Sequence, residues 1–115
     1  MMTTSPGSSR SLTIHHVGST DGTATLTCHG RITFETAELF KSEVKNLAPG
    51  HQRVLADLSE VDFVDSTGLG NVLAAYISAK SAGCDLMLIN VNPRVKDLLN
   101  MTKLAAVLEE GARPD

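Results

Sequence analysis

The sequence predicts a single α/β domain, a mixed β-sheet with a leading antiparallel hairpin and about four α-helices. Two segments of alternating apolar and polar residues come first and are joined by a glycine-containing turn. Apolar runs then alternate with segments of helical periodicity, an order that gives parallel strands joined by right-handed crossover helices. A length of 115 residues suits one hydrophobic core.

The composition narrows the possible functions before any motif is considered. The net charge is −3 with both signs interspersed, so we expect no basic surface for direct nucleic-acid binding. No apolar run approaches the roughly 20 residues of a membrane span, and we expect no membrane insertion. Cys28 and Cys84 lie far apart and outside any metal-binding spacing, which is typical of buried, reduced thiols in a cytoplasmic protein.

The predicted strands are bounded by turn residues. The hairpin is expected to pair Leu12–Val17 with Thr23–His29 through the turn that contains Asp21-Gly22. The later strands, Val54–Leu58 and Leu86–Ile89, are nearly continuous apolar runs, as expected for strands covered on both faces of the sheet. The polar dipeptide that follows the third strand is expected to end it.

Apolar residues at helical spacing predict the helices. The first is expected from Ala37 to Leu47 and the second from Leu69 to Lys80, with Ile77 in its buried stripe. A short third helix follows an Asn-Pro start and extends through Leu99, and a fourth is expected to be capped by Thr102 and to reach Leu108. Polar residues 1–11 are predicted to be a flexible leader, and residues 111–115 a tail.

The stretch Asp65–Gly70 lies between the third strand and the second helix. Its first three residues are of types that cap helices, because their short side chains accept hydrogen bonds from free N–H groups of the first turn. Its two glycines leave the backbone without side chains, so that another molecule can approach closely. In α/β sheets, function concentrates in the loops that follow the carboxyl ends of parallel strands. We therefore expect the functional site here.

This stretch lacks the residues that an enzymatic function would need. A nucleophilic Ser66 would require a Gly-x-Ser-x-Gly turn and a suitably placed histidine, and the sequence has neither. Asp57, Asp62 and Asp65 fit capping and solvated carboxylates better than a metal or phospho-aspartate site, because no lysine or further ligand completes one. Gly68-Leu69-Gly70 lacks the third glycine of a dinucleotide loop. We expect no catalytic residue, metal or cofactor.

Ser66 fits better as a phosphate acceptor. It lies at a helix start, where the peptide dipoles favour an added negative group. Phosphorylation adds about −1.5 to −2 charges. A partner packed on the turn would have to bury that charge unpaired, at a cost on the order of 2–5 kcal/mol, or roughly 30- to several-thousand-fold in affinity. One modified hydroxyl can therefore switch binding without refolding the domain.

The sequence resembles the STAS domains, and among them the bacterial anti-sigma factor antagonists. The resemblance runs from about Leu12 to Leu108 and implies a STAS domain over residues 12–110. Its most specific part is Val54–Gly70, which ends in Asp-Ser-x-Gly-Leu-Gly. Further matching positions are Gly30, Thr36-Ala37, Asn92-Pro93-Arg94-Val95 and Leu99-Asn100-Met101-Thr102-Lys103-Leu104.

The resemblance implies a partner-switching function. In that family an anti-sigma factor that is also a serine kinase phosphorylates the serine after the aspartate. The unphosphorylated domain binds this kinase and frees the sigma factor, phosphorylation ends the binding, and a PP2C-type phosphatase restores it. Ser66 would be the acceptor and Asp65 its orienting neighbour, with ATP bound by the kinase. The implied partner surface comprises Asp65, Ser66, Thr67, Gly68, Leu69 and Gly70.

One segment departs from the family pattern. Many members read Gly-Glu-Leu-Asp after the second strand, where this chain reads Gly30-Arg31-Ile32-Thr33. Arg31 and Thr33 thus replace an acidic pair at a partner contact, and Arg31 would repel an arginine-bearing partner suited to the usual pattern.

The alternative function is a STAS subunit that docks constitutively in a lipid- or solute-transport complex through the same turn.

Overall fold

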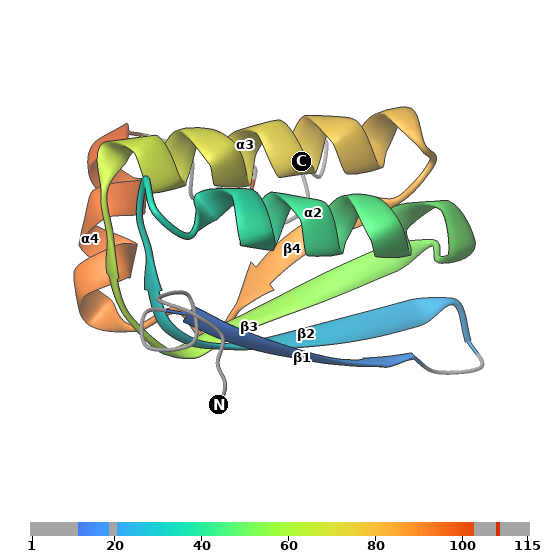
Figure 1. Cartoon of the computed structure of the whole chain (residues 1–115), viewed down its shortest axis with the longest axis horizontal. Helices are drawn as coiled ribbons and strands as arrows, with labels where there is room; N and C mark the ends of the chain where they lie inside the picture. Colours follow the sequence, from blue (N-terminus) through green and yellow to red (C-terminus); the bar gives the residue numbers. More distant parts are fainter. Residues whose placement is uncertain (1–11, 19–20, 103–107, 109–115) are drawn as a thin grey trace.

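A computed structural model describes residues 12–18, 21–102 and 108, which form a mixed four-stranded sheet with helices against it (Figure 1). The sheet order is β1-β2-β3-β4. β1 pairs antiparallel with β2, whereas β2 with β3 and β3 with β4 are parallel, which confirms the predicted sheet. The strands are β1 (Leu12–Gly18), β2 (Thr23–Ile32), β3 (Arg53–Val64) and β4 (Asp85–Ile89).

The helices lie on one face and at one end of this sheet. α2 and α3 run side by side over the face, and α4 lies at the end where β3 passes into α3 (Figure 1). No helix among the described residues is long and apolar enough to cross a membrane. The helices are α2 (Ala37–Leu47), α3 (Ser66–Ser81) and α4 (Pro93–Thr102), with a 3-10 turn, η1 (Ala48–Gly50), after α2.

The described residues thus contain three α-helices, where the sequence predicted about four. The predicted fourth helix lies outside the described residues except for its ends. Leu108 is buried in the core, and Thr102 is the last residue of α4 rather than the start of a new helix. The Thr102 hydroxyl donates hydrogen bonds to the carbonyls of Leu98 and Leu99, at 3.2 and 3.0 Å. Its side chain is therefore bonded within α4, whereas it was predicted to cap a separate helix.

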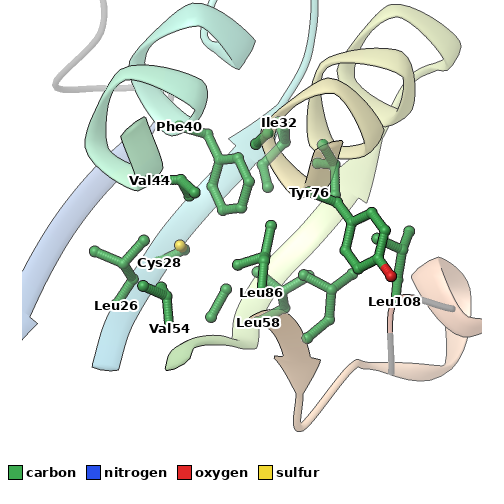
Figure 2. Close-up of a cluster of buried hydrophobic side chains, with 14 of the residues drawn as sticks. Leu26, Cys28, Ile32, Phe40, Val44, Val54, Leu58, Tyr76, Leu86 and Leu108 are labelled. Carbon is green, nitrogen blue, oxygen red and sulfur yellow. The ribbon is translucent and has the colours of Figure 1, made fainter. Parts of the chain in front are cut away.

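The hydrophobic core fills the space between the sheet and the two covering helices (Figure 2). Both cysteines, Cys28 and Cys84, are free and buried there, as predicted. Burial, assisted by the negative charges of Asp57 and Glu43, raises the pKa of the Cys28 thiol to about 12, so this thiol is protonated and unreactive. Other core side chains labelled in Figure 2 are Leu26, Ile32, Phe40, Val44, Val54, Leu58, Tyr76, Leu86 and Leu108.

The prediction that β3 and β4 are covered on both faces is wrong. Ala56 and Leu58 are buried beneath the helices, but Leu55, which points to the other face, is only half-buried. Leu88 and Met87 show the same contrast in β4. The two crossovers advance in one direction along the sheet, from β2 to β3 to β4, so connections of one hand place α2 and α3 on the same face.

β3 is also longer than predicted. The polar pair Ser59-Glu60 does not end it, and the strand continues to Val64. Bulges make this possible, because each leaves one extra residue on β3 and keeps Val61 and Val64 in the core. The extra residues fall between the partners Thr27↔Asp57 and His29↔Glu60, and between Gly30↔Val61 and Arg31↔Phe63.

The predicted burial of Ile77 is also wrong. It is exposed, although it was assigned to the buried stripe of α3. The stripe instead passes through Ala75 and Ala79, small residues that let α3 approach its neighbours closely. Ile77 follows the buried Tyr76, and the rotation of the helix from one residue to the next turns the Ile77 side chain away from the core.

The one-sided sheet predicts a contrast between two leucines of β3. Leu58→Ala should lower the free energy of unfolding by about 2–5 kcal/mol, because it opens a cavity in the core. Leu55→Ala, in the same strand but on the uncovered face, should lower it by less than half as much. Urea unfolding of both variants measures the difference, and equal losses would show that both faces are packed.

Candidate functional site at the start of helix α3

Asp65 caps α3 with its side chain. Its backbone is extended, with φ −92° and ψ 177°, as is usual for an N-cap residue. Oδ1 accepts a hydrogen bond from the backbone N–H of Gly68 at 2.6 Å, and the Asp65 carbonyl accepts one from Leu69 N–H at 2.8 Å. Ser66 is therefore the first residue of α3, so the helix begins before Leu69, its predicted start, and Asp65 is the one of the three predicted capping residues that caps it.

The second carboxylate oxygen of Asp65 binds a segment far away in the sequence. Oδ2 accepts a hydrogen bond from the backbone N–H of Phe34 at 3.2 Å, and the Asp65 N–H donates to the Ile32 carbonyl at 3.2 Å. Phe34 lies between β2 and α2, so one side chain joins the first turn of α3 to the β2–α2 loop. Both connections lie at the same end of the sheet (Figure 1).

The β2–α2 loop is fixed internally by Thr36. Its hydroxyl donates to the Arg31 carbonyl at 2.7 Å and accepts from the Thr33 N–H at 2.9 Å. Thr36 is the only buried polar side chain among the described residues, and these two hydrogen bonds satisfy it. The loop that receives Asp65 is thus itself held in one conformation.

Gly68 serves internal packing rather than access by another molecule. A Cβ at this position would lie 2.0 Å from the Ile32 carbonyl oxygen, so only glycine lets α3 sit this close to β2. Gly68 and Leu69 are both buried, so these two residues of the predicted partner surface are not exposed in the folded domain. At Gly70, which is exposed, a Cβ would meet nothing within 4 Å. The open backbone that was predicted for both glycines is found at Gly70 alone.

The remaining predicted residues lie in the first turn of α3, at the end of β2 and in the loop that follows it. Ser66 and Thr67 are exposed in the first turn of α3, Arg31 is exposed near the end of β2, and Thr33 is half-buried in the loop. Sequence reasoning missed Phe34, whose side chain is 72% exposed. An apolar residue among the polar residues of a predicted loop was the available signal.

The three aspartates considered for a metal or phospho-aspartate site do not come together. Asp65 is used as the cap, Asp62 is exposed, and Asp57 lies within β3. Partial burial favours a higher pKa for Asp57, but hydrogen bonds from Ser59 and the Asn90 side chain outweigh it and lower the pKa. No group of three or more potential metal ligands occurs in the described part of the chain.

The sequence model of the STAS domain family matches residues 16–112. The chain belongs to the STAS domain family. The family match spans all the described elements from late β1 to α4, including the capped turn.

Three relatives illustrate the similarity of this STAS domain to known proteins. A Thermotoga neapolitana protein named as a TM1081 homolog is 32% identical over 80 residues, covering 68% of this chain and 71% of the relative. The anti-sigma F factor antagonist of Paenibacillus polymyxa is 26% identical over 81 residues, covering 69% of each chain. SpoIIAA shares the fold, with TM-scores of 0.69 for its unphosphorylated form and 0.63 for its phosphorylated form. The unphosphorylated form is 17% identical to this chain, and the match covers 81% of this chain and 83% of SpoIIAA. The phosphorylated form is 16% identical, and the match covers 80% of this chain and 85% of SpoIIAA.

The two glycines of the turn should respond oppositely to alanine. Gly68→Ala should destabilise the domain by about 1–3 kcal/mol or more, because the new methyl group meets backbone that cannot move aside easily. Gly70→Ala should stabilise it by about 0.5–1 kcal/mol, because alanine is the better helix former and the site is open. Chemical denaturation tests both, and a shift of the same sign in the two variants would contradict the close contact.

Two substitutions separate the two roles of Asp65. Asp65→Ala should cost about 0.5–2 kcal/mol, the usual effect of removing an N-cap. Asp65→Asn keeps one oxygen for Gly68 but places an NH₂ group where the Phe34 N–H needs an acceptor. Its stability should fall less than that of Asp65→Ala, while amide hydrogen exchange at Phe34 speeds up. Unchanged exchange at Phe34 in Asp65→Asn would show that the loop does not depend on this carboxylate.

Proposed function

We propose that this STAS domain is an anti-sigma factor antagonist whose binding is switched off by phosphorylation of Ser66. The observation that carries the proposal is the exposed serine at the first position of α3, in a turn whose backbone is fixed by Asp65. Relatives named as anti-sigma factor antagonists support it. In this function the unphosphorylated chain binds an anti-sigma factor in the cytoplasm and frees the sigma factor.

The fold is suited to carry a phosphate at Ser66 without rearranging. The N–H groups of Gly68 and Leu69 are already bonded to Asp65, but the N–H groups of Ser66 and Thr67 have no acceptor within the helix. They and the positive end of the helix dipole would stabilise the phosphate and offset its repulsion by Asp65. Phosphorylation should therefore change the surface and leave the domain folded.

A docked partner responds differently to the same phosphate. A charge of about −1.5 to −2 buried without a counter-charge weakens association by about 2–5 kcal/mol. The contact surface in this proposal is formed by Ser66, Thr67, Gly70 and, from the adjoining loop and strand, Thr33 and Arg31. Gly68 and Leu69 shape it from inside. Because Arg31 is a cation, the partner group that faces it is acidic or neutral.

The remaining partners are those that the resemblance to anti-sigma factor antagonists implies. This chain offers an acceptor hydroxyl and no nucleotide motif, so ATP and the phosphate transfer belong to the partner, an anti-sigma factor that is also a serine kinase. A PP2C-type phosphatase resets the switch by removing the phosphate. Both enzymes need access to the serine side chain, and its exposure provides that access.

Incubation with the organism's anti-sigma factor kinases and ATP tests the acceptor. Mass spectrometry should find one phosphate at Ser66, none in Ser66→Ala, and an unchanged Ser66 phosphate in Thr67→Ala. A phosphate on Thr67 alone, or no phosphate from any of the kinases, would contradict the proposal.

The phosphomimetic Ser66→Asp should weaken kinase binding by roughly 30- to several-thousand-fold. Its melting temperature should stay close to that of the unmodified chain, because the change lies on the surface at a helix start. Calorimetric titration and thermal unfolding measure the two effects. Loss of folding in Ser66→Asp would instead make the hydroxyl a structural cap.

A further inference from the structure

Three large apolar side chains are exposed near the end of the sheet that carries Ser66. Phe34 is 72%, Phe63 48% and Met101 80% exposed, and they come from the β2–α2 loop, β3 and α4. Isolated exposed apolar residues are common, but a group of them marks an interaction site. Phe34 is attached to the Ser66 turn through Asp65.

Phe63 and Met101 face a groove between β3 and α4. The groove has a volume of about 360 Å³, and its apolar lining residues are Phe63, Val64, Val95, Leu98 and Met101. Val64 immediately precedes Asp65, so the groove and the Ser66 turn are joined by continuous chain. The groove therefore borders the surface assigned to the partner.

Asn92 holds the two walls of the groove together. Its side-chain amide donates a hydrogen bond to the Val61 carbonyl in β3. Its Oδ1 accepts hydrogen bonds from the N–H groups of Arg94 and Val95, at 2.9 and 3.2 Å, and so caps α4. The groove is thus formed before any partner arrives, which reduces the entropy lost on binding.

The charges around the groove indicate an apolar occupant. Arg94, Asp62 and Asp97 line it, and Arg31 pairs in register with Phe63 on the neighbouring strand. Within the described ranges none of these four side chains forms an ion pair. Two charges of each sign give no net attraction to an anionic surface such as a membrane or nucleic acid, so apolar burial supplies the affinity.

We propose that this groove receives a large apolar side chain from the anti-sigma factor, a contact that rests on the proposed function and extends it. The partner then spans from the groove to the Ser66 turn, with Phe63 and Met101 as its apolar anchors. Anchors of this kind, in a preformed pocket, carry a large share of binding energy in protein complexes. A phosphate at Ser66 lies at one edge of this interface and releases the anchors together with the turn.

Alanine substitution tests the anchors. Phe63→Ala and Met101→Ala should each weaken binding of the unphosphorylated chain to its anti-sigma factor kinase by about 10- to 100-fold. Val17→Ala is the matched control, because Val17 is also exposed, at 69%, but lies near the β1–β2 hairpin, at the end of the sheet opposite to Ser66. It should bind like the wild type, and all three variants should keep the wild-type melting temperature within a few degrees.

A steric test does not depend on side-chain truncation. Both native cysteines are buried, so Met101→Cys and, as control, Val17→Cys each introduce one reactive thiol for a fluorescent maleimide. The label at position 101 should abolish kinase binding, and the label at position 17 should leave it intact. With a small polarity-sensitive label at position 101, a shift produced by concentrating the chain alone would assign the groove to a second copy and overturn the proposal.

The outcomes separate this inference from the proposed function. If the wild type binds the kinase and Ser66→Asp releases it, but the groove variants bind as tightly as the wild type, the groove is not part of the interface and the inference fails alone. If no anti-sigma factor kinase binds the unphosphorylated wild type, the proposed function fails, and the inference fails with it.

Discussion

One carboxylate, that of Asp65, determines how Ser66 is presented. Its two oxygens bind N–H groups of α3 and of the β2–α2 loop, and its own N–H binds the end of β2. Three segments that meet at one end of the sheet are thereby fixed to a single residue. Ser66 itself makes no hydrogen bond through its hydroxyl in the described structure, so its position is set by its neighbour while its oxygen stays available. This arrangement suits the phosphorylation proposed for Ser66, because the residue that fixes the turn is not the residue that would react.

The topology explains why the segments joined by Asp65 lie close to one another. β2 and β3 are adjacent and parallel, so the connections that leave them start side by side. Both crossover helices lie on the same face, and the small residue Gly68 lets α3 settle against the carbonyl of Ile32. The same end of the sheet also carries α4, joined to β3 by Asn92. Strand order therefore brings the start of α3, the β2–α2 loop and α4 to one end of the sheet, where Asp65, Gly68 and Asn92 fix them.

Local chemistry in the sequence was sufficient for much of this. The mixed sheet, the hairpin and a capped helix start within Asp65–Thr67 follow from residue patterns that act over a few positions. The one-sided burial of Leu55 and the role of Gly68 were not predictable, because both depend on contacts between segments distant in the chain. An apolar run reads the same whether one or both faces are covered. A glycine in the first turn of a helix likewise gives the same sequence signal whether it faces a binding partner or a carbonyl group of the same chain.

The bulges in β3 were hidden for a related reason. A polar pair such as Ser59-Glu60 looks like a strand end, and only pairing with β2 shows that the strand absorbs extra residues and continues. Phe34 was missed because an exposed aromatic residue has no periodicity to reveal it. Its significance comes from Asp65, a residue 31 positions later.

The bulged strand also limits how this chain can vary in length. Between Asp57 and Ser66, an insertion or deletion that no bulge takes up would invert the side chains that follow it and turn Asp65 away from Phe34. Homologous chains should therefore keep the interval from Asp57 to the serine constant, or change it only by residues that a bulge takes up.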